Sequence, residues 1–373
     1  MDKQRIAILC GGQSAEHDIS VISARTVNQT LKETFDIIVV YITEEGTWYA
    51  LDEAESLQTN EPRDLIKSKK AHQLLLIPGA GASTLAYAHD ITQSVAIDCV
   101  FPMLHGTNGE DGRVQGMLEM LSLPYVGCDA VSASICMEKI LTKRLLKQAG
   151  ISTPHWLEVC SNNREQFDYA SVAKELGDVF FVKPATLGSS IGMTKVKKAD
   201  QFEKALDFAF MFDRRVIIET AIKGREIECS VIGNDEPSAS LPGEVICHHD
   251  YYSYEAKYCD PKAAEIVSPA DLPREIVTKI QKLAVETYQV LFCSGLARVD
   301  FFLEENGTVS VNEVNPMPGM TQISLYLKNW AVTGSSHADI LNELIRLAQQ
   351  RDEERKTLSR VCMTDTNKST DTV

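Results

Sequence analysis

Residues 295–321 read GLARVDFFLEENGTVSVNEVNPMPGMT, and this pattern predicts a β-hairpin. Two apolar runs cover residues 297–303 and 308–314. Between them lies an Asn-Gly pair at 306–307, the strongest short-range signal for a two-residue hairpin turn. The sequence therefore predicts two antiparallel strands joined by a tight turn.

The register of this hairpin places acidic side chains against each other. A two-residue turn sets Asp300 opposite Glu313 and Arg298 opposite Asn315, all on one face because strand side chains alternate with a period of two. The opposite face is apolar and holds Val299, Phe301, Val311 and Val314. Two facing carboxylates repel each other unless a cation lies between them. A solvated charged face is the alternative, which the apolar opposite face disfavours.

The ligand types of this face suit a hard metal ion. Carboxylate and amide oxygens, with no Cys or His nearby, favour Mg²⁺, whose other ligands are usually waters and substrate phosphates. The hairpin therefore predicts a metal site whose partner is a nucleotide.

Composition limits the classes of function. The chain has 373 residues, of which 44% are hydrophobic, and a formal net charge of −15. This length supports two or three cores, and the acidic balance opposes nucleic acid and anionic membranes as partners. Ten cysteines without a C-x-x-C motif, and no apolar segment of about 18 residues, indicate reduced thiols and a cytoplasmic protein. The histidine pair at 248–249 lacks a spaced partner, so zinc is not expected.

The chain divides into segments with different patterns. Residues 1–130 alternate apolar runs with helical stretches, which predicts an open parallel α/β domain, although residues 51–95 show no clear pattern. Residues 131–222 and 223–350 predict two further α+β domains. In the first of these, a single helical stretch is expected to end at Gly150. The polar tail over 351–373 is expected to be disordered.

A loop rich in glycine and serine is a candidate phosphate site. Residues 180–196 read FFVKPATLGSSIGMTKV, a pattern of strand, loop and strand. Backbone N–H groups and hydroxyls in such a loop suit a phosphate, and Lys183 adds a positive charge. The segment is not a Walker A motif, and an ordinary hairpin loop is the alternative.

Four further segments suggest ligand contacts. Glu16 follows a glycine turn that lacks G-x-G-x-x-G, so it suggests an ammonium contact or a helix-start acid rather than a dinucleotide site. Glu219 and Glu226 follow an apolar strand and offer acceptors for adenine and ribose. His105 ends a strand, where a functional role and a capping or core role are both open. Residues 248–264 read as a long loop, and such loops are often lids.

Seven segments in this order resemble the D-alanine–D-alanine ligase family of the ATP-grasp superfamily. They are GGQSAEHDIS (11–20), HGTNGEDGRVQGMLE (105–119), VKPATLGSSIGM (182–193), IETAIKGREIE (218–228), YEAKY (254–258), GLARVDFF (295–302) and NEVNPMPGMTQISL (312–325). The resemblance runs from about residue 5 to residue 350. It implies an ATP-grasp fold, in which an N-terminal open parallel α/β domain is followed by two α+β domains that hold ATP between them.

The resemblance implies a nucleotide site and a metal site. The implied nucleotide contacts are Lys139 and Lys183 for the phosphates, the loop Gly188, Ser189 and Ser190 over them, Glu219 and the backbone of Ile222 for adenine, and Glu226 for ribose. The implied ligands of two Mg²⁺ or Mn²⁺ ions are Asp300, Glu313 and Asn315. These metal ligands agree with those that the hairpin register suggests by itself.

The resemblance also implies two D-alanine subsites. Glu16 matches the residue that binds the first ammonium group, and Ser189 and Tyr258 match its partners in a hydrogen-bonded triad. The other implied substrate contacts are His105, Lys257, Ser324 and Leu325, of which the last two hold the second carboxylate. The implied oxyanion site is Arg298 with the backbone N–H of Gly319.

The implied reaction joins two D-alanine molecules for peptidoglycan synthesis. One carboxylate attacks the γ-phosphate of ATP, and the amine of the second D-alanine attacks the resulting acyl phosphate. A lid around Tyr258 would exclude water from this intermediate. The implied partners are ATP and D-alanine, and the implied assembly is a homodimer.

Two departures from the family pattern and three rival functions remain open. The phosphate loop has no charged residue before Gly188, and Thr220 stands where some relatives have lysine. Either change could alter nucleotide affinity, and neither removes a catalytic group. The rivals are another ATP-grasp carboxylate–amine ligase, above all a D-alanine–D-lactate ligase on the same scaffold, a dinucleotide-dependent oxidoreductase, and a nucleotide-binding module without catalysis.

Overall fold

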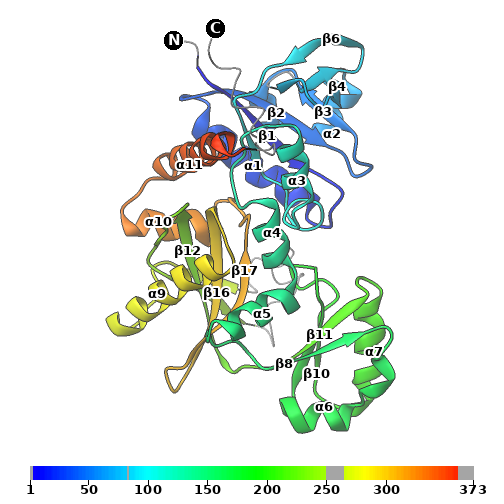
Figure 1. Ribbon diagram of the computed structural model, residues 1–373, viewed down its shortest axis with the longest axis vertical. Coiled ribbons are helices and arrows are strands. Elements are labelled where there is room, and N and C mark those ends of the chain that lie inside the picture. The colour runs from blue at the N-terminus through cyan, green and yellow to red at the C-terminus, as the bar shows by residue number, and fades with distance from the viewer. Residues whose placement is uncertain (1–2, 82–83, 249–263, 360–373) are drawn as a thin grey trace, which may run out of the picture.

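In the described part of the chain, three sheets are arranged along the long axis of the molecule. The computed structural model describes residues 3–81, 84–248 and 264–359 (Figure 1). Each sheet lies within one of the three domain ranges expected from the sequence. The N-terminal sheet lies at one end, the C-terminal sheet in the middle and the central sheet at the other end. Within the described ranges, no helix is long and apolar enough to cross a membrane.

The N-terminal sheet has seven strands in the order β6-β5-β4-β3-β2-β1-β7. The elements of this domain are β1 (Arg5–Gly11), α1 (His17–Leu31), β2 (Asp36–Ile42), β3 (Trp48–Leu51), η1 (Ala54–Gln58), α2 (Pro62–Lys67), β4 (Ala71–Leu76), β5 (Leu85–Tyr87), β6 (Asp90–Val95), β7 (Cys99–Pro102) and α3 (Arg113–Met120). The pairs β1–β2 and β1–β7 are parallel, and the other pairs are antiparallel. The predicted parallel sheet is therefore confirmed for three strands, and residues 51–95 supply most of an antiparallel extension.

The strand β1 is buried on both faces because helices cover both. Ile6 and Ile8 belong to the same core as α1 and the last helix of the chain, α11 (His337–Thr357). Ala7 and Leu9 belong to a second core that includes α3. This alternation explains why the RIAILC run is almost continuously apolar.

The central domain has a four-stranded antiparallel sheet in the order β10-β9-β11-β8. Its elements are α4 (Ala130–Met137), α5 (Lys139–Gln148), β8 (Trp156–Cys160), η3 (Arg164–Gln166), α6 (Tyr169–Leu176), β9 (Phe180–Pro184), β10 (Thr194–Val196), α7 (Ala199–Phe210) and β11 (Arg215–Thr220). The helices α6 and α7 pack against one face of this sheet through residues such as Val182 and Ile218. Side chains of the other face, including Lys183 and Glu219, line a cavity.

The helical stretch that leads into this domain is interrupted, although a single helix was expected. It forms α4 and α5, which are separated at Glu138. The Glu138 carboxylate accepts a hydrogen bond from the backbone N–H of Leu141 at 2.5 Å and so caps the start of α5. Gly150 follows α5 with a φ of 77°, in agreement with the expected helix end.

The C-terminal domain has a six-stranded sheet with β15-β14-β12-β16-β17 in order and β13 paired to β12. Its elements are β12 (Gly224–Gly233), β13 (Ser238–Ala239), β14 (Gly243–Cys247), β15 (Ala264–Val267), α9 (Arg274–Val290), β16 (Gly295–Glu304), β17 (Val309–Asn315), α10 (Leu325–Thr333) and α11. The helix α11 returns to pack against α1, so the first and last parts of the chain share one core.

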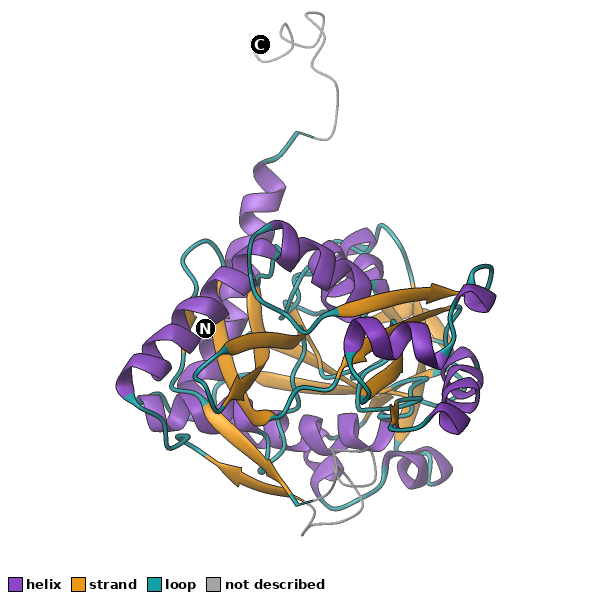
Figure 2. Cartoon of the chain, turned by 90° about the horizontal axis from the view of Figure 1, so that it is seen from below, coloured by secondary structure: helices purple, strands orange, loops and turns teal. Residues whose placement is uncertain are grey.

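The chain was expected to be disordered from residue 351, but α11 extends beyond that point. Residues 351–357 are helical rather than disordered, and Figure 2 shows this end of α11 projecting from the molecule. Asp352 forms ion pairs with Lys356 at 2.6 Å and with Arg355 at 3.0 Å. Such contacts between positions three and four apart stabilise a helix. Residues 360–373 lie outside the described part of the chain.

The hairpin of β16 and β17 has the predicted pairs but a different turn. Asp300 lies opposite Glu313 and Arg298 opposite Asn315, as expected. The turn, however, has three residues (305–307) rather than two, because the N–H of Glu304 donates to the carbonyl of Thr308 at 2.9 Å.

A bulge at Asn312 restores the predicted register. Val311 and Val314 are both buried, yet they lie three positions apart, which strict alternation would place on opposite faces. The ladder shifts by one residue between Asp300 and Phe301, so Asn312 is the extra residue on β17. The predicted pairing of Asp300 with Glu313 is correct because the longer turn shifts the register by one residue and the bulge shifts it back.

Candidate active site

Two cavities meet at the hairpin. The first, of about 560 Å³, lies between the central and C-terminal sheets, and the second, of about 690 Å³, lies between the N-terminal and C-terminal domains. Four residues line both cavities, namely Glu228, Val245, Arg298 and Glu313. A molecule in each cavity would therefore meet the other at these side chains.

The first cavity collects most residues of the predicted nucleotide site. Its lining includes Lys139, Lys183, Gly188, Ser190, Glu219, Ile222, Glu226, Asp300 and Glu313. Ser189 differs from its neighbours in the loop and lines the second cavity instead. Both Ser189 and Ser190 have positive φ angles, of 52° and 59°, in the left-handed region that L-residues rarely adopt.

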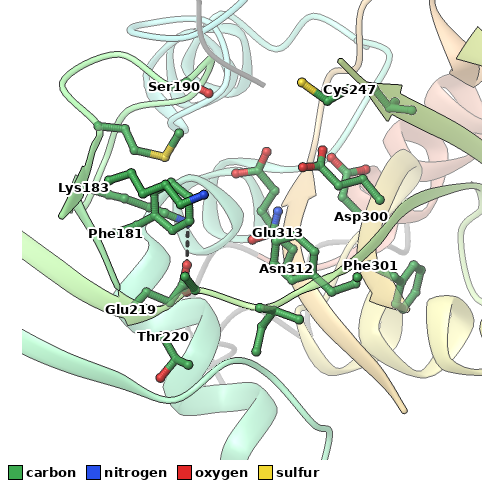
Figure 3. A pocket seen from close by; sticks show the side chains of 18 of the residues that line it. Phe181, Lys183, Ser190, Glu219, Thr220, Cys247, Asp300, Phe301, Asn312 and Glu313 are labelled. Carbon is green, nitrogen blue, oxygen red and sulfur yellow. Dashed lines mark hydrogen bonds and ion pairs between the residues drawn. The ribbon is translucent and has the colours of Figure 1, made fainter. Parts of the chain in front are cut away.

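Two lysines neutralise Glu219 at the wall of the first cavity. Lys143 of α5 contacts one oxygen of the Glu219 carboxylate, and Lys183 of β9 contacts the other. Figure 3 shows Lys183 and Glu219 facing each other. Burial favours a raised pKa for Glu219, but attraction to Lys143 and Lys183 outweighs burial and lowers the pKa to about 2. Glu219 is therefore ionised at neutral pH.

Lys139 connects the start of α5 to the phosphate loop. Its backbone N–H donates to the carbonyl of Ala185 at 2.9 Å, and its ammonium group donates to the carbonyl of Leu187. Burial lowers the pKa of Lys139 although Glu313 acts in the opposite direction. The lysine is thus held beside the loop that the sequence assigns to phosphates.

The facing carboxylates were expected to need a metal ion as their cation, but Arg298 also supplies positive charge beside them. Its guanidinium donates to both oxygens of Asp300 at 2.7 Å, and its Nε lies 3.0 Å from Glu228 on β12. Burial acts to lower the pKa of Arg298, but Asp300 and Glu228 raise it well above its usual value. A facing pair of carboxylates therefore does not by itself require a metal ion, because an arginine on the same strand also neutralises it.

The oxygen donors at the hairpin nevertheless fit a hard cation. Figure 3 shows the carboxylates of Asp300 and Glu313 pointing into the same space. Asp300 Oδ2 accepts from the amide N–H of Asn315 at 2.9 Å and from Arg298 at 2.7 Å, and Oδ1 accepts from Arg298 Nε at 2.7 Å. In the part of the chain that the structure describes, no group of three His, Cys, Asp or Glu residues forms a metal site, so Asn315 would have to contribute its amide oxygen.

The second cavity collects the predicted substrate residues of the N- and C-terminal domains. Its lining includes Glu16, His105, Ser189, Arg298, Gly319, Ser324 and Leu325. Glu16 lies at the N-terminus of α1 and accepts a hydrogen bond from the hydroxyl of Ser189. Two members of the predicted triad are therefore in contact, whereas Lys257 and Tyr258 lie outside the described residues.

A buried chain of hydrogen bonds joins the N-terminal domain to the turn after β17. His105 Nδ1 lies 3.1 Å from the carbonyl of Met317, and Nε2 lies 3.1 Å from the hydroxyl of Ser23. Burial lowers the pKa of His105, so its ring is neutral, with the proton on Nδ1. Ser23 accepts from the N–H of Met320 at 3.3 Å. His105 therefore holds the turn that contains Gly319, rather than offering a free nitrogen to the cavity.

Gly106 and Glu110 shape the wall beside Glu16. Gly106 has a φ of 67°, and a Cβ there would lie 2.6 Å from a Glu16 oxygen, so this position requires glycine. The N–H of Gly106 donates to the carboxyl group of Glu110 at 2.6 Å. Burial, and then repulsion from Glu16, raise the pKa of Glu110 to about 8. Glu110 is therefore mostly protonated at neutral pH.

Ser324 and Leu325 form the start of α10 at the far side of the second cavity. The hydroxyl of Ser324 accepts a hydrogen bond from the N–H of Thr321 at 3.0 Å, which fixes the turn before the helix. The N–H groups of the first helical turn have no partner within the helix, and they suit an anionic group. This end of the cavity can therefore bind a carboxylate.

Two family models match this chain, namely "D-ala D-ala ligase N-terminus" over residues 5–128 and "D-ala D-ala ligase C-terminus" over residues 145–346. The chain belongs to the D-alanine–D-alanine ligase family. This ligase is 42% identical to the D-alanine–D-alanine ligase of Coxiella burnetii (strain RSA 493 / Nine Mile phase I), over 96% of this chain and 97% of that protein. It is 42% identical to D-alanine–D-alanine ligase A of Escherichia coli (strain K12), over 94% of this chain and 97% of that protein.

Solved structures agree with this assignment. The structure of the Coxiella burnetii D-alanine–D-alanine ligase matches with a TM-score of 0.88 at 38% identity, covering 96% of this ligase and 97% of that chain. The VanG D-Ala:D-Ser ligase from Enterococcus faecalis matches with a TM-score of 0.84 at 35% identity, covering 93% and 100%. The ligase therefore has the ATP-grasp fold that its sequence predicts.

Sequence analysis missed three residues that the structure adds to the site. Lys143 follows Lys139 by four positions and so lies on the same side of α5. Glu228 follows Glu226 by two positions and so shares its face of β12. Both spacings were visible in the sequence. Ser23 gave no signal, because its partners are distant in the chain.

Proposed function

We propose that the ligase holds ATP in the first cavity and D-alanine in the second, and that the reaction occurs where Arg298 and Glu313 line both. The enzyme is an ATP-dependent ligase that joins two D-alanine molecules for peptidoglycan synthesis, as its family membership over nearly the full chain supports. The observation that supports this division of the site is that these two side chains, together with Glu228 and Val245, line both cavities.

In the first cavity, we assign the adenosine to the part lined by Glu219 and Glu226 and the phosphates to the part lined by Lys139 and Lys183. Glu219 and the backbone of Ile222 would bind adenine, and Glu226 at the start of β12 would bind ribose. The assigned phosphate contacts are Lys139, Lys183, Gly188, Ser189 and Ser190. The lysine ammonium groups supply the positive charge that a polyphosphate needs.

The hairpin would hold divalent metal ions through Asp300, Glu313 and Asn315. Such ions, Mg²⁺ or Mn²⁺, neutralise charge on the phosphates during transfer. Arg298 orients the Asp300 carboxylate through two hydrogen bonds of 2.7 Å at the wall of the first cavity. The observation in favour of this proposal is the cluster of oxygen donors on one face of the hairpin.

In the second cavity we assign the ammonium group of the first D-alanine to Glu16, whose orientation the hydroxyl of Ser189 fixes. Arg298 and the N–H of Gly319 would stabilise the oxyanion formed when the second amine attacks. Ser324 and Leu325 would hold the second carboxylate at the start of α10. Lys257 and Tyr258, in the predicted lid, would contact the second D-alanine and exclude water.

The second substrate is the point at which this assignment is most open to test. A relative of similar fold carries the name D-Ala:D-Ser ligase, and a D-lactate ligase on the same scaffold is a rival. We expect D-alanyl-D-alanine as the main product when D-alanine, D-serine and D-lactate compete at neutral pH. Mass spectrometry of the products would decide, and a predominance of either mixed product would refute the assignment.

The activity itself is tested by phosphate release from ATP with and without D-alanine. We expect release to depend on D-alanine and on a divalent cation, and to be abolished by a chelator. Release that ignores D-alanine would contradict a ligase. We further propose that the enzyme acts in the cytoplasm as a homodimer, for which light scattering of the purified protein should give twice the mass of one chain.

A further inference from the structure

Glu219 has two positively charged partners that differ in their access to the first cavity. Lys183 lies on the cavity wall, and its ammonium group is 5.5 Å from the centre of the Phe181 ring, which also lines the cavity. Lys143 lies behind the wall, with a side chain that is 2% exposed, and donates to the hydroxyl of Thr153 at 2.7 Å. A ligand in the cavity can therefore reach Lys183 but not Lys143.

The proposed function gives Lys183 a second partner. It assigns Lys183 to the phosphates of ATP, whereas in this structure the Lys183 ammonium contacts Glu219 (Figure 3). Binding of ATP would thus draw Lys183 away from a carboxylate whose side chain is 3% exposed. Removing one partner from a buried ion pair is strongly destabilising when the remaining charge has no other partner.

We infer that Lys143 is a positioning residue, a permanent counter-ion of Glu219 that allows Lys183 to move from Glu219 to the ATP phosphates. This inference rests on the proposal that ATP occupies the first cavity. Lys143 contacts the oxygen of Glu219 that Lys183 does not use, so its ion pair survives the departure of Lys183. Glu219 then stays ionised and can accept a hydrogen bond from the adenine amino group. The lysine exchange replaces one ion pair by another and leaves no buried charge alone.

The inference predicts that Lys143 matters for phosphates more than for adenine. In Lys143→Met, Lys183 must remain on Glu219, so ATP affinity should fall about tenfold or more. Adenosine has no phosphates and leaves Lys183 in place, so its affinity should fall less than about threefold by the same reasoning. Competition binding of ATP and of adenosine to the full-length enzyme measures both values. Equal losses, or an unchanged ATP affinity, would overturn the inference.

A matched control lies one turn further along α5. Lys147 is exposed, and its ammonium group contacts the Trp156 ring at 5.3 Å from the centroid rather than Glu219. Lys147→Met removes the same charge from the same helix and should leave the ratio of ATP to adenosine affinity unchanged. A similar fall in that ratio for Lys147→Met would mean that general electrostatics, and not the exchange, explains the Lys143 result.

A double-variant cycle tests the exchange through Glu219 itself. In a Glu219→Gln background there is no buried carboxylate to neutralise, so adding Lys143→Met should change ATP affinity less than about threefold. If Lys143→Met alone unfolds, this double variant still decides, because it removes both charges together. A tenfold loss of ATP affinity relative to Glu219→Gln would refute the inference. Lys143→Arg keeps the charge and should keep the wild-type ratio of affinities.

These outcomes are distinct from failure of the proposed function. If the wild-type enzyme bound neither ATP nor adenosine at the first cavity, Glu219→Gln and Lys183→Met would leave nucleotide affinity unchanged. The inference is contradicted specifically when those two variants weaken ATP binding and Lys143→Met does not.

Discussion

The two cavities are built from different kinds of backbone. The first takes its charged groups from strands and one helix, where Lys183, Glu219 and Asp300 each already have an ion-pair partner. Apart from the strand residues that line both cavities, the second takes its groups from turns and helix starts, which hydrogen bonds between distant parts of the chain hold together, such as those of His105 with Ser23 and Met317. Ion pairs thus fix the charged groups of the first cavity, and long-range hydrogen bonds fix the turns of the second.

The largest expected effect tests the charged groups of the first cavity. Asp300→Asn should lower turnover by about a hundredfold or more, as for loss of a few kcal/mol of charge stabilisation. The protein should remain folded, because Arg298 keeps Glu228 at 3.0 Å as a second partner. Steady-state rates with Mg²⁺ and a melting curve measure the two effects. Full activity with Mg²⁺ would show that the first cavity does not depend on this carboxylate.

The next effect tests Arg298, which lines both cavities. Arg298→Lys keeps the charge but loses the fork that donates to both oxygens of Asp300, so turnover should fall by about tenfold to a hundredfold. The affinity for ATP should change little, which nucleotide binding measures separately. Parallel losses in ATP affinity and turnover would instead place Arg298 in the first cavity alone.

A smaller effect tests the hydrogen bonds that hold the turns of the second cavity. Ser23→Ala removes the hydroxyl between His105 and the N–H of Met320, at a cost of about 1 to 2 kcal/mol. The turn containing Gly319 would loosen, so the KM for D-alanine should rise several-fold, while the KM for ATP should not change. An increase in both KM values would show that the two cavities are not independent in this respect.

The last expected effect concerns stability and its dependence on pH rather than turnover. The pKa of Glu110 is raised from 4.5 to about 8 in the folded protein, so folding favours its protonated form. Its contribution is complete below about pH 4.5 and is lost as pH rises to about 8. Glu110→Gln cannot ionise, so its stability relative to wild type should increase by up to about 4 kcal/mol between pH 5 and pH 8. Denaturant unfolding at pH 5 and pH 8 measures this, and a constant difference would contradict the raised pKa.

The sequence predicted the first cavity better because strand alternation has a short period. The facing of Asp300 and Glu313 followed from the hairpin pattern alone, before any resemblance was considered. The turn length was wrong, although the sequence held a signal. Val311 and Val314 are apolar residues three positions apart, and only a bulge can bury both in a two-period strand.

Most of the second cavity was predictable only through the resemblance. His105 and Met317 are separated by 212 positions, and Ser23 and Met320 by 297, so no local pattern connects them. The resemblance supplied Gly319 and Ser324, but it did not supply the residues that hold their turn. Such supporting contacts depend on how three domains pack, which residue spacing does not encode.

The bulge at Asn312 also has a consequence for how the length of this hairpin can vary in evolution. Phe301 pairs with Val311 and Asp300 with Glu313, on either side of the extra residue. A deletion of Asn312 would therefore leave each neighbouring pair with its present partner and would remove only the local kink. We expect this position to tolerate a lost codon, whereas loss of Val311 or Val314 would bring a polar residue to the buried face.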